Sequence, residues 1–153
     1  MSEHRATVEW NHSGDFDYRT YPRLHAVDFG HGIRVPGNAA PENIPRTVPA
    51  TTGVDPEQAF VASLSACHML WFLQLACQAK LTVTRYLDSA TGILEKNSEG
   101  VPAMTRVTLR PSVSFSGTPP SSDEHARLHH KAHEECFIAN SVRTEVIVEP
   151  RIA

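Results

Sequence analysis

Cysteine is scarce in this sequence, and the three cysteines present are unevenly spaced. Cys67, Cys77 and Cys136 are separated by 10 and 59 residues. These spacings match no zinc ribbon or zinc finger, and an odd number of thiols in a reducing compartment does not make a disulfide framework. Catalytic or redox use of two of the thiols, with the third as a bystander, is the interpretation left open.

Runs of basic residues and a secretion signal are absent as well. Lysine and arginine number 14 against 17 aspartates and glutamates, and the formal net charge is −3. Nucleic acid and anionic membrane surfaces are therefore poor candidates as partners, because both attract concentrated positive charge. Residues 1–5 lack the apolar core of a signal peptide, so we expect a cytoplasmic location.

What the sequence does have is one long apolar segment, at residues 55–79. Asp55 suits the N-cap position of a helix, Pro56 suits the first helical position, and Gln58 completes a capping box with Asp55. No glycine or proline then interrupts the segment. Its apolar residues point in all directions around a helix rather than along one stripe. We therefore predict a long helix that must be covered on most sides.

A membrane span is the alternative interpretation of this segment. Residues 59–77 carry no formal charge, and about 18 apolar residues are enough to cross a bilayer. The segment nevertheless contains Ser63, Ser65, His68 and Gln74, and no basic flank would orient it in a membrane. We predict a core helix instead, with Cys67 in the middle of it.

Shorter elements surround the predicted helix. The residue pattern predicts strands at 7–10, 18–29, 33–35, 81–86, 91–96, 104–115 and 143–150, and a second helix from Ser121 or Ser122 to about Cys136. Residues 36–53 form a loop with four prolines. Without internal repeats or a linker, residues 1–153 are expected to form a single α+β domain, in which the long hydrophobic helix packs against antiparallel sheets.

Two motifs give the sequence a resemblance to a known family. Residues 55–67, Asp-Pro-Glu-Gln-Ala-Phe-Val-Ala-Ser-Leu-Ser-Ala-Cys, resemble the helix signature of the OsmC/Ohr family, which runs from Asn-Pro-Glu to Ala-Cys. Residues 132–141, Ala-His-Glu-Glu-Cys-Phe-Ile-Ala-Asn-Ser, resemble the second signature of that family, Ala-His-x-x-Cys followed by Asn. Both motifs occur in the family's order and each contains its cysteine. The resemblance covers residues 7–150.

This resemblance implies an OsmC-like fold, an intertwined homodimer and a cysteine peroxidase that reduces organic hydroperoxides without a cofactor. By position, Cys67 would be the peroxidatic thiol and Cys136 the resolving thiol. Cys67 would be oxidised to a sulfenic acid, which condenses with Cys136 to a disulfide. An external dithiol, for which family members use lipoyl groups or related dithiols, would then reopen the disulfide by exchange.

The resemblance also implies a charged pair that activates the thiol. Glu57 occupies the family's glutamate position, and counting back nine residues from the turn glycine Gly32 gives Arg23 as the family's arginine, with Arg19 as the competing choice. A cation is needed because burial raises the pKa of a thiol, and Cys67 lies too far along its helix to benefit from the helix dipole. Arg23 would stabilise the thiolate, and Glu57 would hold the guanidinium through a bidentate pair.

Spacing gives a separate reason to expect a dimer. Glu57 and Cys67 are ten residues apart, which is roughly 15 Å along one continuous helix. The two residues therefore cannot share a site within one subunit. Two such helices packed antiparallel around a two-fold axis would bring the glutamate of one chain to the cysteine of the other, and would cover the apolar helix.

The remaining candidate side chains have simpler interpretations. His68 follows Cys67 directly, but adjacent helix positions point about 100° apart, so a core or interface role is favoured over tuning of the thiol. Cys77 lies in the same apolar segment and is expected in the core.

Two other classes of function stay open. A non-catalytic protein that binds small molecules or lipids, or a redox sensor, would use an apolar interface pocket. A metal-binding protein would use His125, His129 and His133, which fall at four-residue intervals ahead of Cys136, with Cys67 and His68 completing the site. A solvated helix face explains the same spacing, and we favour that interpretation.

Overall fold

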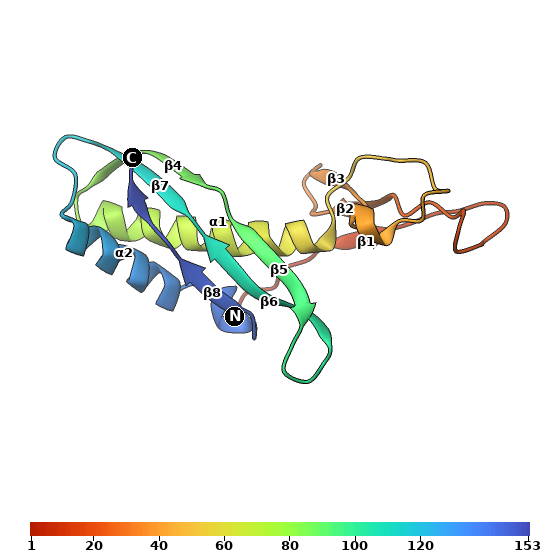
Figure 1. Cartoon of the computed structure of the whole chain (residues 1–153). Coiled ribbons are helices and arrows are strands. Elements are labelled where there is room, and N and C mark those ends of the chain that lie inside the picture. The colour runs from red at the N-terminus through yellow and green to blue at the C-terminus, as the bar shows by residue number, and fades with distance from the viewer. The chain divides into compact units, whose positions relative to one another are not determined.

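The computed structural model describes all 153 residues and consists of two compact units, Met1–Ala59 and Phe60–Ala153. Figure 1 shows the order of the elements along the chain.

The first unit contains a three-stranded antiparallel sheet in the order β1 (Thr7–Glu9), β2 (His25–Asp28) and β3 (Arg34–Gly37). The turn between β2 and β3 has positive φ angles at Gly30, His31 and Gly32, a conformation for which glycine has no steric penalty. The strand predicted over 18–29 is confined to the four residues His25–Asp28. Its beginning is a turn, in which the carbonyl of Asp17 accepts the backbone N–H groups of Thr20 and Tyr21.

Helix α1 spans Pro56–Gln78, as the sequence predicts. The capping box is confirmed, since Asp55 Oδ1 accepts the Gln58 N–H at 2.7 Å and Gln58 Oε1 accepts the Asp55 N–H at 3.2 Å. At the other end Lys80 has a positive φ of 60°. The N–H of Leu81 donates to the carbonyl of Ala76 at 3.0 Å, which is the hydrogen bond that closes a Schellman motif. Local chemistry therefore fixes both ends of the helix.

The second unit contains two three-stranded sheets, in the orders β4-β7-β9 and β5-β6-β8. The strands are β4 (Thr82–Asp88), β5 (Thr91–Lys96), β6 (Pro102–Leu109), β7 (Pro111–Ser116), β8 (Glu145–Val148) and β9 (Arg151–Ile152). The pairs β4·β7 and β5·β6 are antiparallel, as expected, but β7·β9 and β6·β8 are parallel. The sheets are therefore mixed.

A break at Arg110 divides the strand predicted over 104–115 into β6 and β7. The Arg110 N–H leaves the strand pairing and donates to Asp88 Oδ1 at 2.6 Å, while the guanidinium bonds to Glu149 and Thr91. The other carboxylate oxygen of Asp88 accepts the Ser65 hydroxyl of α1 at 2.5 Å. One carboxylate thus joins the corner of the strands to the helix. The last predicted strand is likewise divided, into β8 and β9.

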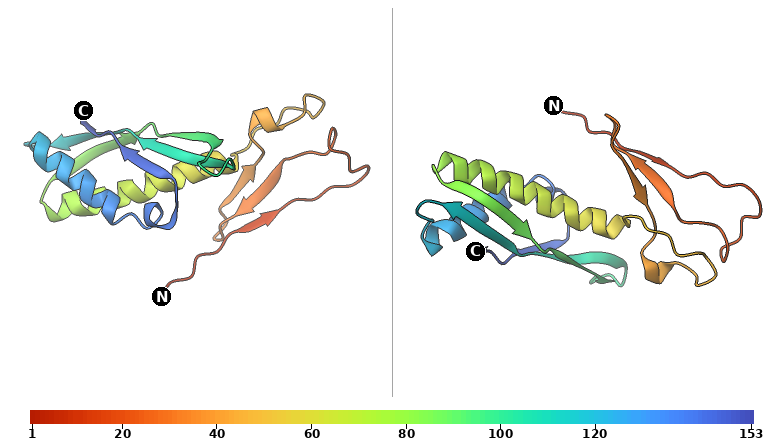
Figure 2. Two further views of the ribbon diagram at one scale, coloured as in Figure 1. Left: turned by 60° about the horizontal axis from the view of Figure 1, so that its bottom comes forward. Right: turned by 90° about the horizontal axis from the view of Figure 1, so that it is seen from above.

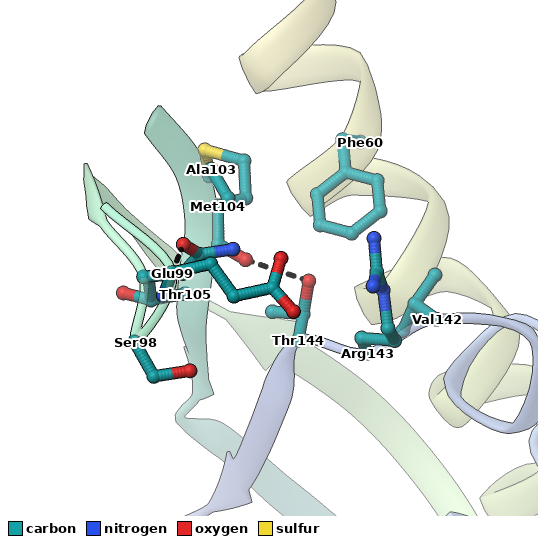
Figure 3. A pocket seen from close by; sticks show the side chains of 10 residues that line it. Phe60, Ser98, Glu99, Ala103, Met104, Thr105, Val142, Arg143 and Thr144 are labelled. Carbon is teal, nitrogen blue, oxygen red and sulfur yellow. Dashed lines mark hydrogen bonds between the residues drawn. The ribbon is translucent and has the colours of Figure 1, made fainter. Parts of the chain in front are cut away.

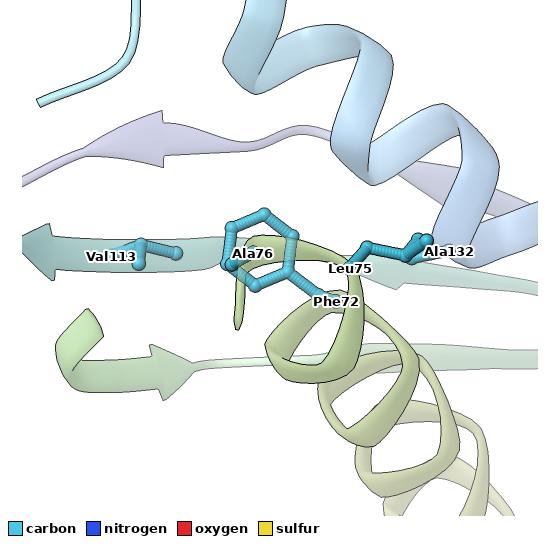
Figure 4. Packing of buried hydrophobic residues seen from close by; sticks show 5 residues of the cluster. All are labelled: Phe72, Leu75, Ala76, Val113 and Ala132. Atoms are coloured by element: carbon cyan, nitrogen blue, oxygen red, sulfur yellow. The ribbon is translucent and has the colours of Figure 1, made fainter. Parts of the chain in front are cut away.

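Helices α1 and α2 (Ser122–Glu134) form the core of this unit with the strands. Figure 2 shows α1 running along the strands, and Ser121 caps α2 by accepting the Glu124 N–H. One cluster of buried residues, shown in Figure 4, consists of Phe72, Leu75, Ala76, Val113 and Ala132. A second consists of Leu64, Val107 and Leu109.

Phe72 and Leu64 have no exposed surface. By length and composition α1 is the one helix that could cross a membrane. Its buried residues nevertheless pack on strands and on α2, as a core helix does.

Candidate functional site

Two of the three thiols are neighbours in the second unit. Cys67 lies in the middle of α1 and is partly buried, and Cys136 follows the end of α2 with 1% of its surface exposed. The pKa of the Cys136 thiol is raised to about 11, first by burial and then by a hydrogen bond and charge interaction with the Cys67 side chain. The Ala139 N–H, which donates to Cys136 Sγ at 3.4 Å, opposes this shift. The fold therefore brings together the two cysteines that the sequence motifs single out.

The third thiol lies apart from this pair. Cys77, near the end of α1, is exposed in the chain, so the expectation of a core position was wrong. The helix turns about 100° per residue, and Ala76 takes the buried position beside it.

Arg23 lines an apolar pocket in the first unit. The pocket has a volume of about 400 Å³, and its walls include Trp10, Phe16, Tyr21 and His25. The three aromatic rings contact one another, with Phe16 and Tyr21 centroids 4.8 Å apart. A pocket of this composition accepts an apolar group and offers it one cation.

The guanidinium of Arg23 is held in place by its own segment. It lies 3.6 Å from the centroid of the Tyr21 ring and donates to the carbonyls of Tyr21 and Tyr18. Arg19 is exposed and forms hydrogen bonds through its backbone alone, with its N–H donating to Asp17 Oδ1 and its carbonyl accepting the hydroxyl of Thr47. Of the two candidate arginines, Arg23 is therefore the one with a fixed side chain in a pocket.

Glu57 lies in the first turn of α1 and is partly buried. It forms no ion pair within the chain, so the predicted pair with Arg23 is not made inside one subunit. Its position near the helix N-terminus is electrostatically favourable for a carboxylate.

A row of buried histidines connects the two helices. His68 Nε2 and His129 Nδ1 are 3.0 Å apart, and His129 Nε2 and His125 Nε2 are 3.3 Å apart. The exposed fractions of His68, His129 and His125 are 0%, 1% and 4%. The interpretation of 125, 129 and 133 as a solvated helix face was therefore wrong. Sequence spacing alone did not show that His68 of α1 supplies the partner that makes this burial possible.

The histidine row does not form a metal site. No group of three or more His, Cys, Asp or Glu side chains is arranged to hold a metal ion. His129 uses one ring nitrogen for His68 and the other for His125, so the nitrogens form a chain instead of converging on one point. Metal coordination requires convergent donors. The geometry gives the metal-binding hypothesis no support.

We expect the buried histidines to destabilise the fold at low pH. Burial is the main reason that the pKa of His68 falls from 6.5 to about 4 and that of His129 to about 3. Below pH 6.5 the unfolded chain binds protons on these rings and the folded chain does not. As the pH falls below 6.5, the free energy of unfolding therefore decreases by about 1.4 kcal/mol per pH unit for each histidine, until the pH reaches the folded-state pKa.

Urea unfolding at a series of pH values between about 7 and about 5 measures this loss. His129→Gln removes one titrating ring and should flatten the dependence by one histidine. An unchanged slope in that variant would contradict the assignment of His129 as a buried neutral ring.

A second, more polar pocket lies in the unit Phe60–Ala153, with a volume of about 660 Å³. Figure 3 shows Phe60 and Arg143 on one side of it and Ser98 and Glu99 on the other. Thr144 lies between them and donates to the carbonyl of Met104 at 2.7 Å. Neither thiol of the cysteine pair lines this pocket, so it does not belong to the predicted site.

Comparison with protein families identifies this arrangement. Residues 49–151, which include α1 and both sequence motifs, match the family model described as OsmC-like protein. The chain belongs to the OsmC-like family. A comparison with curated proteins gives no match.

Solved structures of OsmC-like proteins share this fold. An OsmC-like protein of unknown function from Vibrio cholerae is 46% identical, with a TM-score of 0.92 over 99% of this chain and 100% of that one. An OsmC-like protein from Mycoplasma pneumoniae is 15% identical, with a TM-score of 0.77 over 99% and 98% of the two chains. The organic hydroperoxide resistance protein OhrB of Bacillus subtilis is 18% identical, with a TM-score of 0.65 over 99% and 98%. The predicted OsmC-like α+β fold is confirmed.

Proposed function

We propose that this OsmC-like protein is a cysteine peroxidase that reduces organic hydroperoxides. The observation that carries the proposal is the neighbouring pair of free thiols, Cys67 on α1 and Cys136 after α2. Two adjacent cysteines of different exposure fit the division between a peroxidatic and a resolving thiol. The fold shared with proteins that are named for organic hydroperoxide resistance supports the choice of oxidant.

In this mechanism the Cys67 thiolate attacks the distal oxygen of the hydroperoxide. The O–O bond breaks, the alkoxide leaves and takes a proton to become an alcohol, and Cys67 becomes a sulfenic acid. The Cys136 sulfur then attacks the Cys67 sulfur, so that an S–S bond forms and the S–O bond breaks. The hydroxide leaves as water with the Cys136 proton. An external dithiol, of which a lipoyl group is one type, returns both thiols to the reduced state and is itself oxidised to a disulfide.

Arg23 and Glu57 complete the proposed site from a second subunit. Arg23 would stabilise the Cys67 thiolate and offer hydrogen bonds to the peroxide, and Glu57 would orient the guanidinium. The apolar pocket beside Arg23 would take the organic group of the substrate. Because Glu57 and Cys67 lie ten residues apart on one continuous helix, the carboxylate that serves a given thiol must come from the other chain.

A homodimer also accounts for the surface of α1. Leu70 in this helix is 63% exposed and Phe137 beside Trp71 is 68% exposed in the single chain, and exposed apolar side chains of this size mark interfaces when they are clustered. Two copies of α1 would cover each other. In this proposal residues 1–153 form one OsmC-like domain of a cytoplasmic homodimer.

Oxidation by a single equivalent of hydroperoxide tests the proposed function. Cumene hydroperoxide should remove two free thiols per chain, without a change in intact mass beyond the loss of two hydrogens. Hydrogen peroxide in the same amount should act more slowly, because the pocket offers it no apolar group to bind. If all three thiols remain titratable after both treatments, the protein is not a peroxidase.

A non-catalytic binding protein or redox sensor is the second candidate, favoured by the aromatic pocket around Trp10 and Tyr21. Such a protein would copurify with an apolar ligand and consume little hydroperoxide per chain. Extraction into organic solvent followed by mass spectrometry distinguishes it from the peroxidase. A ligand found together with turnover would instead assign the pocket to the substrate.

Cys136→Ser should stop the reaction at the sulfenic acid. Without the resolving thiol, Cys67 cannot form the intramolecular disulfide, so the oxidised intermediate accumulates. Intact mass after one equivalent of hydroperoxide should increase by one oxygen atom, and dimedone should label Cys67. The first oxidation should proceed at the wild-type rate, whereas turnover with dithiol should fall. Disulfide formation through the exposed Cys77 would contradict the assignment of Cys136.

Arg23→Gln should reduce the rate of Cys67 oxidation by about 10²-fold, which is the usual cost of removing one charged donor from a reacting centre. Arg23→Lys should recover part of that loss, because it restores the charge but not the two-pronged donor. Arg19→Gln is the matched control and should react like wild type. If the Arg19 variant is the slow one, the roles of the two arginines must be exchanged.

A further inference from the structure

The histidine row His68–His129–His125 has no part in the reaction described so far. It is a continuous hydrogen-bonded chain of three rings, with contacts of 3.0 and 3.3 Å. Its inner member follows Cys67 directly in the sequence, and its other two members lie on α2, the helix that leads to Cys136. The row therefore joins the two helices that precede or carry the thiols.

The two ends of the row have different surroundings. At the inner end, His68 Nδ1 is enclosed and has no hydrogen-bond partner. The same is true of His133 Nδ1, one helical turn before Cys136, and the charge of His133 is felt at His68. At the outer end, His125 retains 4% exposure near the start of α2, and its Nδ1 is not among the enclosed unpaired atoms.

If all three rings are neutral, the two contacts can be made by two sets of tautomers, which differ in the direction in which the hydrogen bonds run. Each set is called a proton order. In one order, His125 Nε2–H donates to His129 Nε2 and His129 Nδ1–H donates to His68 Nε2, which leaves the proton of His68 on its Nδ1. In the other order, each ring donates in the opposite direction and the proton of His125 lies on its outer Nδ1. Entry of one proton at His125 Nδ1 and exit of one from His68 Nδ1 converts the first order into the second. A neutral imidazole can do this because it has one donor and one acceptor nitrogen.

The surroundings of the row favour this conversion over leakage to other groups. His129 stacks on Phe72 at 4.1 Å, and Phe115 flanks His125 at 6.1 Å, so apolar rings line the row. Tyr86 is the other titratable group packed against it, at 6.5 Å from His129. Burial raises the pKa of Tyr86, so its hydroxyl keeps its proton. Burial also keeps His68 and His129 neutral near pH 7.

The thiol chemistry requires a proton path of this kind. Cys136 is 1% exposed, and each reduction of the Cys67–Cys136 disulfide expels its sulfur as a thiolate. A thiolate in an apolar interior is costly, and a thiol of high pKa is a poor leaving group. Delivery of a proton to that sulfur as the S–S bond breaks removes both obstacles.

We propose that the His68–His129–His125 row is a proton relay between solvent and the Cys67–Cys136 pair. The inference rests on the proposed function in one respect, that the two thiols cycle through a disulfide. During reduction, the dithiol sulfur attacks Cys67, the S–S bond breaks, and the proton that Cys136 takes from the inner end is replaced at His125 from water. His133 lies between His129 and Cys136 in the sequence, and its charge interaction with His68 makes it a candidate for the step between the inner end and the thiol.

The test uses reduction of the disulfide and needs no hydroperoxide. Full-length protein is oxidised with diamide, the excess is removed, and free thiols are followed after addition of dithiothreitol. His129→Gln fills the site with an amide that can donate and accept but cannot exchange a proton between its two ends. It should slow reduction by at least about tenfold, in the range in which loss of a proton-transfer group is felt. His130→Gln, at an exposed position on the same helix, is the matched control and should reduce at the wild-type rate.

A second variant separates a relay from a structural role. His125→Ala opens the outer end to solvent, and it should also be slow. Added imidazole should restore its rate in proportion to concentration, while leaving the wild-type and His130→Gln rates unchanged. Wild-type rates in both row variants, or a slow His125→Ala variant that imidazole does not rescue, would overturn the relay.

The same experiment keeps the two proposals apart. A disulfide that forms with diamide but not with cumene hydroperoxide would remove the peroxidase and leave the relay test valid. Normal hydroperoxide consumption combined with wild-type reduction rates in the row variants would remove the relay alone. Failure of diamide to join Cys67 and Cys136 would overturn both.

Discussion

Cys67→Ser should lose hydroperoxide reduction by on the order of 10³-fold or more, because a serine hydroxyl stays protonated where a thiol ionises. The substitution changes one atom in a partly buried position of α1, so the helix and its contacts should survive. Consumption of cumene hydroperoxide with dithiothreitol as the reductant measures the loss, and circular dichroism checks that the fold is retained. No other substitution is expected to reduce activity more.

The control for this prediction is the exposed thiol near the end of the same helix. Cys77→Ser makes the same chemical change ten residues further along α1 and should leave activity unaltered. A Cys67→Ser protein that still consumes hydroperoxide, or a Cys77→Ser protein that does not, would show that the wrong thiol had been assigned.

Phe72→Ala should have the largest effect on stability, a loss of about 3–5 kcal/mol in the free energy of unfolding. Phe72 has no exposed surface, contacts β7 through the cluster that contains Val113, and stacks on His129 at 4.1 Å. Alanine leaves a cavity that α1, α2 and the strand cannot close without moving. Urea unfolding followed by tryptophan fluorescence measures the change, with the midpoint falling and the slope unchanged.

Phe72→Leu is the corresponding control, because it keeps most of the buried volume and should cost less than about 1.5 kcal/mol. If the alanine variant is no less stable than the leucine variant, Phe72 is not packed as described. The rate of disulfide reduction in Phe72→Leu also tests whether the proposed relay depends on the stacking of Phe72 on His129, because this variant removes the stacking ring and keeps the three histidines.

The parts of the fold that could be predicted are those that local sequence determines. Helix α1 was predicted with its capping box because Asp55 and Gln58 satisfy each other's backbone within four residues. The cap of α2 at Ser121 depends on local contacts in the same way. The break at Arg110 could not be predicted, because alternation of apolar and polar residues continues through it. Its cause is a bond to Asp88, a residue 22 positions away.

In the candidate site as well, features determined by local sequence could be predicted and features that depend on distant contacts could not. The motifs singled out Cys67 and Cys136, and the fold makes them neighbours. The burial of His125 and His129 was missed, because three histidines on one helix look polar until a fourth from another helix provides a partner. His68, a histidine inside an apolar segment, was the one signal that could have indicated it. Glu57 forms no ion pair within the chain, so its predicted role depends on the proposed dimer.

The Asp88 carboxylate limits how far the Cys67 sulfur can move along the axis of α1. It receives the hydroxyl of Ser65 and the backbone of Arg110 at the same time, and Ser65 precedes Cys67 by two residues. An apolar helix without such a tether can slip along a sheet at little cost, since one methyl contact replaces another. Here a slip would break the bond from Ser65 to a carboxylate that the backbone of Arg110 holds in place. The position of the Cys67 thiol along the helix axis is therefore fixed, and any movement that brings the two sulfurs to bridging distance falls to the segment that carries Cys136.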